Sequence, residues 1–160
     1  MNVATMNTGQ AVQLTKSGHD ELSAELLALQ KTKRPKAVLR VQTARDFGDL
    51  SENAEYHAAR EELNFIDGRI DELEEILARA RVVGVPKTAG VIGIGCKVTV
   101  ATDGQMHTFH VVGEWEANPA EKKISHDSPL GKALIGKKVG EKVEVDAPAG
   151  KVIYTIKKIY

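Results

Sequence analysis

The chain has 160 residues, of which 42% are hydrophobic and 4% are aromatic, and its formal net charge at pH 7 is zero. This hydrophobic content excludes wholesale disorder, the length suits one or two small domains, and the neutral charge gives no general attraction to nucleic acid. The charge is nonetheless uneven along the chain. Residues 1–81 carry 11 basic and 14 acidic side chains, whereas residues 82–160 carry 11 basic and 8 acidic ones.

The N-terminal residues and the single cysteine indicate the cellular compartment in which the protein is expected. Residues 1–13 lack the basic start and apolar run of a signal peptide, and no stretch approaches the roughly 18 apolar residues of a membrane span. Cys96 has no partner for an internal disulfide, which favours a reducing compartment, and we expect it to be a small buried hydrophobe. We therefore expect a cytoplasmic protein without a membrane segment.

The first helical pattern begins after Thr15 or Ser17, either of which can cap a helix. One apolar stripe follows at helical spacing, then shifts in phase beyond Pro35; its members are Leu22, Leu26, Leu29, Ala37, Val41 and Ala44. Because the pattern continues past the proline, we expect one bent helix rather than two separate ones.

The second helical pattern is more regular. Its apolar residues follow alternating spacings of three and four, which is typical of a coiled-coil seam; they are Tyr56, Ala59, Leu63, Ile66, Ile70, Leu73, Leu77 and Ala80. The two patterns have nearly equal length, so they predict an antiparallel hairpin whose end lies between them.

The stretch from Arg45 to Tyr56 occupies that end and contains four acids: Asp46, Asp49, Glu52 and Glu55. One interpretation is structural: Asp49 caps the second helix and Glu52 completes a capping box. The other is functional: Asp49 and Glu52, three apart on a helical face, share one Mg²⁺. Two carboxylates are too few for a complete metal site, so a second molecule would have to supply the rest.

Beyond Arg81 the pattern becomes β-type. Residues 97–101 alternate, Asp103-Gly104 predicts a hairpin turn, and residues 106–112 run back. Asp127 or Ser128 caps a short helix that ends at Gly136, and a last hairpin spans residues 143–159. The predicted class is α+β, with a helical hairpin over residues 1–82 and a small α+β domain over residues 83–160.

Other kinds of site find little support in the sequence. The histidines do not have the spacing of zinc ligands, and no Ser/His/Asp or Cys/His arrangement for nucleophilic catalysis can be defended. The Gly93-Ile94-Gly95 segment is not followed by the helix that a nucleotide-binding loop needs.

The run from Gly48 to Glu61, GDLSENAEYHAARE, closely resembles the GreA/GreB family of bacterial transcript cleavage factors. The likeness continues through Phe65–Ile70 and returns at Val111–Gly113, Ser128–Gly136 and Pro148–Gly150, so that it covers nearly all of residues 15–160. The resemblance implies a coiled-coil hairpin followed by a C-terminal domain of FK506-binding-protein-like topology.

The resemblance also implies a function. Members of this family dock on RNA polymerase, insert the hairpin into its secondary channel and stimulate cleavage of the 3′ end of backtracked nascent RNA. The family's two catalytic acids fall on Asp49 and Glu52, which would share a Mg²⁺ of the polymerase active site, with no cofactor bound stably by the factor alone. The basic residues that contact RNA match Arg45 and Arg60. As docking residues we expect Ser128, Pro129, Leu130 and Gly136.

Several alternatives stay open. The same fold would suit a channel-blocking inhibitor of RNA polymerase, although the intact pair of Asp49 and Glu52 argues against it. The C-terminal topology also suggests a peptidyl-prolyl isomerase, whose pockets are richer in aromatic residues than this half of the chain. A scaffold without chemistry would not need paired acids. We expect a monomer that is not itself an enzyme and that meets RNA and the DNA template only within the elongation complex.

Overall fold

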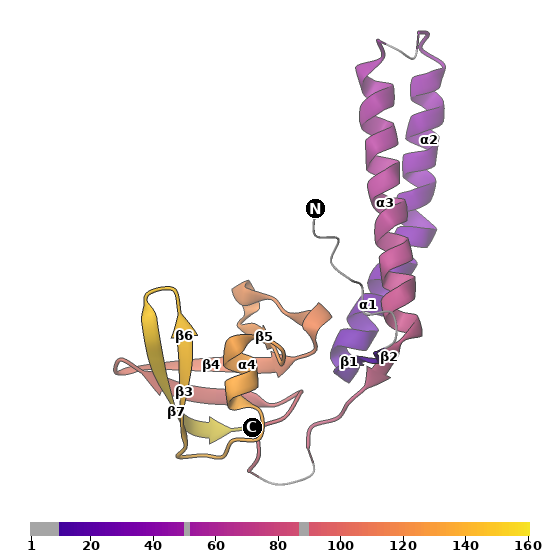
Figure 1. Cartoon of the computed structure of the whole chain (residues 1–160). Helices are drawn as coiled ribbons and strands as arrows, with labels where there is room; N and C mark the ends of the chain where they lie inside the picture. The colour runs from indigo at the N-terminus through magenta and orange to yellow at the C-terminus, as the bar shows by residue number, and fades with distance from the viewer. Residues whose placement is uncertain (1–9, 50–51, 87–89) are drawn as a thin grey trace. The chain divides into compact units, whose positions relative to one another are not determined.

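A computed structural model describes residues 10–49, 52–86 and 90–160 (Figure 1). The chain divides into two compact units. One is the helical segment Asp20–Arg79, and the other combines the described residues before it with those that follow it. The expected α+β class, a helical hairpin and a small sheet domain, is confirmed.

The first arm of the hairpin is continuous but not uniform. Helix α1 (Lys16–Ala28) passes into a π-helical segment, η1 (Leu29–Lys33), and then into helix α2 (Arg34–Arg45). The Arg34 N–H donates to the carbonyl of Leu29, five residues back rather than four. Proline has no N–H and its ring clashes with the carbonyl four residues earlier, so Pro35 accounts for this local widening. The expected continuation through Pro35 is confirmed, and the extra residue in the turn explains the phase shift of the stripe.

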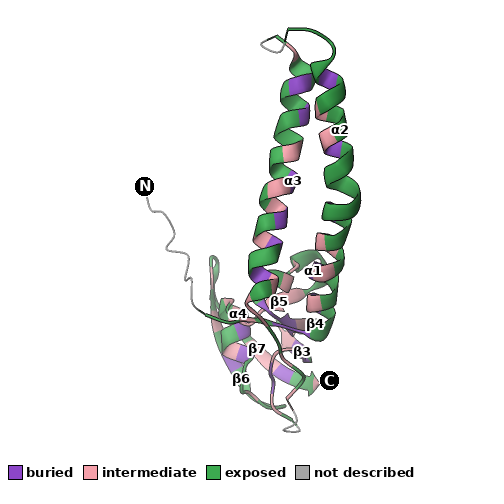
Figure 2. Cartoon of the chain, turned by 90° about the vertical axis from the view of Figure 1, so that its right-hand side faces the viewer, coloured by how far each residue is buried: buried purple, intermediate pink, exposed green. Residues whose placement is uncertain are grey.

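The second arm is the uninterrupted helix α3 (Ala54–Ala78). Figure 2 shows buried positions along the facing sides of α2 and α3. On α3 they are Tyr56, Ala59, Ile66, Ile70, Leu73 and Ile76. The predicted seam is confirmed over most of its length and is wrong at its end. There Ile76 is buried in place of Leu77, and Ala80 has already left the helix for strand β2 (Ala80–Val82).

Gly68 lies in the interior of α3 on its exposed side, and a Cβ atom built there would meet no atom within 4 Å. No packing requirement therefore calls for glycine, which costs about 1 kcal/mol relative to alanine inside a helix. We expect Gly68→Ala to raise the free energy of unfolding of the hairpin by about 1 kcal/mol, measured by chemical denaturation with circular dichroism. An unchanged or lower free energy of unfolding would contradict the finding that a Cβ atom at residue 68 has room.

Polar pairs join the two arms. The Arg69 guanidinium donates two hydrogen bonds to the Glu25 carboxylate, from Nε at 2.8 Å and from Nη2 at 3.0 Å. Arg34 Nε lies 2.7 Å from Asp67 Oδ1, and Gln30 Nε2 lies 2.7 Å from Glu74 Oε1. These contacts fix the register between the arms more than they stabilise them, because partly exposed pairs are screened by water.

The Arg69–Glu25 pair predicts a pH dependence. The hydrogen bond from Arg69 lowers the pKa of Glu25 below its ordinary value of 4.5. The pair therefore stabilises the hairpin fully above that value, and the contribution is lost as the pH falls through the lowered pKa. We expect Glu25→Gln to reduce the free energy of unfolding by about 0.5–1 kcal/mol at neutral pH, and by progressively less as the pH falls below 4.5. Denaturation of both proteins over this pH range measures the difference, and a deficit that does not change with pH would contradict the prediction.

The sequence did not predict the small parallel sheet that strand β1 (Val12–Leu14) forms with β2. Directly after β1, the Thr15 side chain caps α1 by accepting from the Gly18 N–H at 3.0 Å. The Glu116 carboxylate accepts from the Thr15 backbone N–H at 2.8 Å and from its hydroxyl. It also accepts from the Gly113 N–H at 3.0 Å. These hydrogen bonds all lie within the unit that contains the C-terminal sheet.

The C-terminal sheet has five strands in the order β5-β4-β3-β7-β6. They are β3 (Lys97–Thr102), β4 (Gln105–Val112), β5 (Lys123–Ser125), β6 (Lys142–Ala147) and β7 (Gly150–Ile159). The turn at Asp103-Gly104 has positive φ at both residues, as the sequence predicts for a tight hairpin. The short strand β5, parallel to β4, was not predicted.

Helix α4 (Pro129–Leu134) and two short 3-10 helices, η2 (Glu114–Glu116) and η3 (Pro119–Glu121), complete this unit. Its core is apolar and includes the predicted buried cysteine; the members are Ile92, Cys96, Val98, Val100, Val111, Leu134, Val143 and Ile156. Among the described residues, no helix is both long and apolar enough to cross a membrane.

Candidate functional site at the hairpin end

The end of the hairpin is a loop rather than a continuation of either helix. Helix α2 ends at Arg45, Gly48 has a φ of 113° that suits glycine, and α3 does not begin until Ala54. Leu50 and Ser51 of the predicted motif lie outside the described residues.

The capping box proposed for Asp49 and Glu52 is wrong. The N-cap of α3 is Asn53, whose side-chain oxygen accepts from the Tyr56 N–H at 3.0 Å. Asparagine is as good an N-cap as aspartate, and its position four residues later moves the helix start beyond both acids. Glu52 therefore lies in the loop, and the two acids do not share a helical face.

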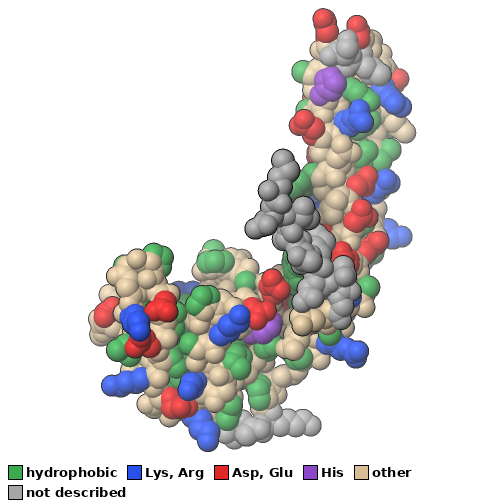
Figure 3. Space-filling model, viewed as in Figure 1, with side chains coloured by type: hydrophobic (Ala, Val, Ile, Leu, Met, Phe, Trp, Pro, Cys, Tyr) green, Lys and Arg blue, Asp and Glu red, His purple; other side chains and the backbone are tan. Residues whose placement is uncertain are grey.

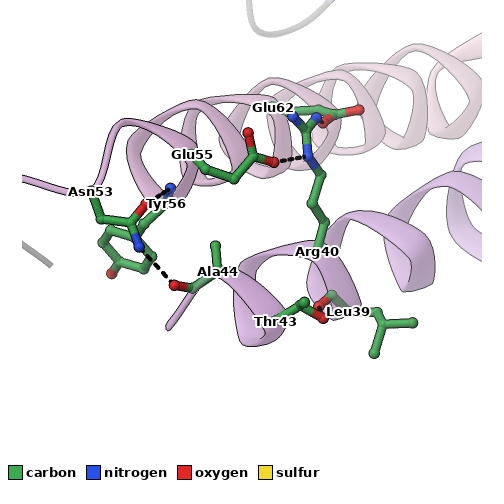
Figure 4. Close-up of polar contacts among 8 residues, drawn as sticks. All are labelled: Leu39, Arg40, Thr43, Ala44, Asn53, Glu55, Tyr56 and Glu62. Atoms are coloured by element: carbon green, nitrogen blue, oxygen red, sulfur yellow. Dashed lines mark hydrogen bonds and ion pairs between the residues drawn. The ribbon is translucent and has the colours of Figure 1, made fainter. Parts of the chain in front are cut away.

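Asn53 makes a second contact that the sequence did not predict. Its Nδ2 donates to the carbonyl of Ala44 at 2.7 Å, so that one side chain joins the last turn of α2 to the first turn of α3 (Figure 4). The same carbonyl accepts from the Phe47 N–H at 3.3 Å. The two ends of the loop are thereby held together at a buried part of the seam, formed by Ala44 and Tyr56.

The two acids predicted to be catalytic, Asp49 and Glu52, are both exposed in this loop. Acidic side chains lie at the free end of the hairpin in Figure 3. Within the described parts of the chain, no group of three or more His, Cys, Asp or Glu side chains is arranged to hold a metal ion. Two carboxylates alone are too few ligands for a complete Mg²⁺ site.

Glu55 differs from these acids although it lies nearby in the sequence. Arg40 Nε lies 2.7 Å from Glu55 Oε1, and Arg40 Nη1 lies 2.5 Å from Glu62 Oε2 (Figure 4). The hydrogen bond from Arg40 lowers the pKa of Glu55. Glu55 thus pairs with α2 within the hairpin, and sequence reasoning missed Arg40 because the contact crosses between arms.

Both predicted RNA-contacting residues are exposed near the loop. The Arg45 guanidinium carbon lies 6.0 Å from the centre of the Tyr56 ring, within the range of a cation–π contact. Tyr56, predicted only as a seam residue, therefore also lies within contact range of Arg45. Arg60 lies one helical turn further along α3.

Two of the four predicted docking residues have structural roles in the C-terminal unit. The Ser128 hydroxyl caps α4 by accepting from the Gly131 N–H at 3.0 Å, as the sequence predicts for this residue. Leu130 packs against the core, whereas Pro129 and Gly136 are exposed. Docking by these four residues stays a prediction.

Comparison with known proteins gives matches over almost the whole chain. Residues 12–82 match the family described as transcription elongation factor, N-terminal, and residues 87–160 match the family described as transcription elongation factor, GreA/GreB, C-term. The chain is 45% identical over 150 residues to transcription elongation factor GreA of Rhodospirillum rubrum, covering 92% of this chain and 96% of that protein. It is 46% identical over 154 residues to the GreA of Hyphomonas neptunium, covering 94% and 98%. A crystal structure of GreA factor homolog 1 of Thermus thermophilus is 33% identical, with a TM-score of 0.44 and coverage of 94% and 99%.

Proposed function

The chain belongs to the GreA/GreB family of transcription elongation factors, and on that premise we propose that it makes RNA polymerase cleave the 3′ end of backtracked nascent RNA. The observation that carries the proposal is the pair of exposed carboxylates, Asp49 and Glu52, in the loop at the end of a long, narrow hairpin. Arrested elongation complexes would thereby regain a 3′ end in the active site.

The narrow hairpin suits insertion into a channel. Helices α2 and α3 bury a single seam, and most of their exposed residues are polar, with Leu39 and Phe65 as exposed apolar exceptions. The hairpin can therefore extend without a surrounding core. The C-terminal unit has a core of its own and supplies the surface that docks on the polymerase. Ser128, Pro129, Leu130 and Gly136 are the docking residues we propose.

Each residue of the hairpin end has a role in this proposal. Asp49 and Glu52 would hold a Mg²⁺ together with groups of the polymerase, and bound there the ion supplies positive charge for activating water and stabilising the leaving oxygen. Both carboxylates are exposed and able to accept hydrogen bonds from water and so orient it. Arg45 and Arg60 bind a phosphate of the displaced RNA, since guanidinium groups suit phosphate geometry.

Because half of the catalytic groups would come from the polymerase, the factor alone is not an enzyme in this proposal. We propose that it acts in the cytoplasm as a monomer, and that it meets the nascent RNA and the DNA template only within the elongation complex.

The test is a purified backtracked elongation complex incubated with and without the protein and scored for RNA shortening. We expect cleavage to be accelerated and elongation to resume when nucleotides are added. A channel-blocking inhibitor would instead slow elongation without shortening the RNA, and that result would overturn the proposal. A prolyl-peptide assay on the same preparation distinguishes the isomerase alternative.

A further inference from the structure

We propose that Asn53 is a positioning residue for the acidic loop, holding Asp49 and Glu52 in the geometry that cleavage requires. This inference rests on the proposed function. It assigns a role to a side chain that is neither one of the two acids nor one of the arginines.

The orientation of the Asn53 amide follows from its two partners. Its oxygen faces an N–H, that of Tyr56, and its nitrogen faces a carbonyl, that of Ala44. Rotating the amide by half a turn would place its NH₂ group against the N–H of Tyr56 and its oxygen against the carbonyl of Ala44. Both contacts would be repulsive, so the two backbone groups determine the orientation of the amide. Both hydrogen bonds are partly buried, which makes the loss of either one costly.

The backbone groups that Asn53 joins belong to the packed end of the seam. Ala44 and Tyr56 are 2% and 8% exposed, so neither partner moves freely. The chain between them, residues 45–52, contains both acids, and Glu52 directly precedes Asn53. The contact to Ala44 therefore fixes the distance between the two described ends of this segment, one of which is next to Glu52.

A simple capping role does not account for asparagine here. Aspartate or serine also caps a helix N-terminus well, but neither offers an N–H to the carbonyl of Ala44. Aspartate would place a second acceptor against that carbonyl, and the serine side chain is too short to bridge the two arms. Asn53→Asp and Asn53→Ser thus keep the cap and remove the link between the arms.

The test uses both variants of the full chain. In the free protein we expect unchanged helicity and faster hydrogen exchange at the Phe47 amide, which bonds to the same carbonyl, with no change at Ile66 in the middle of α3. With backtracked complexes we expect an affinity for polymerase within about twofold of the unaltered protein. We expect the maximal cleavage rate at saturating factor to be about tenfold lower, the effect of losing one partly buried hydrogen bond. Both variants lose the link to Ala44, so we expect their cleavage rates to fall by the same factor. Since only Asn53→Asp adds a charge, an equal fall separates the loss of the link from an effect of charge.

Unchanged exchange at Phe47 would overturn the inference, because the contact would then not hold the loop. A normal maximal cleavage rate in both variants, while Asp49→Asn is inactive in the same assay, would overturn the positioning role and leave the proposed function standing. If the unaltered protein does not stimulate cleavage, the proposed function falls, and the positioning role falls with it.

Discussion

Asp49→Asn and Glu52→Gln should each reduce the stimulated cleavage rate by at least about a hundredfold while leaving the affinity for RNA polymerase within about twofold. Losses of this size are typical when one group that stabilises charge in the transition state is removed. Neither substitution should affect folding, because both residues lie in the exposed loop and the N-cap of α3 is Asn53. The measurement is the single-turnover cleavage rate of a backtracked complex at saturating factor, together with competition binding against the unaltered protein.

The matched control is Asp46→Asn. Asp46 is an exposed acid at the same end of the hairpin, directly after the last residue of α2, and it is not one of the two acids proposed to act in cleavage. We expect it to retain cleavage within a few-fold. If all three substitutions reduced the rate equally, the loop would act through its total negative charge rather than through two particular carboxylates.

Gly131→Ala should destabilise the C-terminal unit by about 3 kcal/mol. A Cβ atom at this position would lie 2.0 Å from the carbonyl oxygen of Ser125 and 3.0 Å from the Cα of His126. These are backbone atoms, so α4 would have to move away from β5 and withdraw Leu134 from the core. The only tryptophan, Trp115, lies in this unit and reports its unfolding in denaturant by fluorescence.

Lys132→Ala is the control for that substitution. Lys132 is an exposed neighbour in the same helix, so its loss should change the free energy of unfolding by no more than about 0.5 kcal/mol. If the Gly131→Ala protein were as stable as this control, α4 could shift without cost. That result would contradict the prediction that the close packing of Gly131 against the Ser125 carbonyl requires glycine.

The periodicity of the sequence predicts the hairpin well because its seam depends on local spacing. Tyr56, Ala59, Ile66, Ile70 and Leu73 are buried as predicted. The pattern could not distinguish Ile76 from Leu77 at the end of α3, since both positions are apolar and only the exit of the chain into β2 decides between them. The pairing of β1 with β2 joins segments far apart in the sequence, and no local signal indicates it.

The hairpin end shows a different limit. Asp49-Leu50-Ser51-Glu52 fits the capping-box pattern, and Asn53 fits an N-cap equally well, so propensity alone does not choose the start of α3. The contact between Asn53 and the carbonyl of Ala44 favours the later start, and it exists only once the two arms are packed. The sequence therefore indicates the two acids as candidates, but it does not indicate the contact from Asn53 that joins the two ends of their loop.

The shared metal ion is tested by a Mg²⁺ titration of RNA cleavage in a backtracked complex, with the unaltered protein, with the Asp49→Asn/Glu52→Gln double variant and with no factor. If Asp49 and Glu52 supply ligands to an ion that the polymerase holds weakly, the unaltered protein lowers the Mg²⁺ concentration needed for half-maximal cleavage. The double variant should then require as much Mg²⁺ as the polymerase alone. A faster rate with an unchanged Mg²⁺ requirement would contradict the role of these carboxylates as metal ligands.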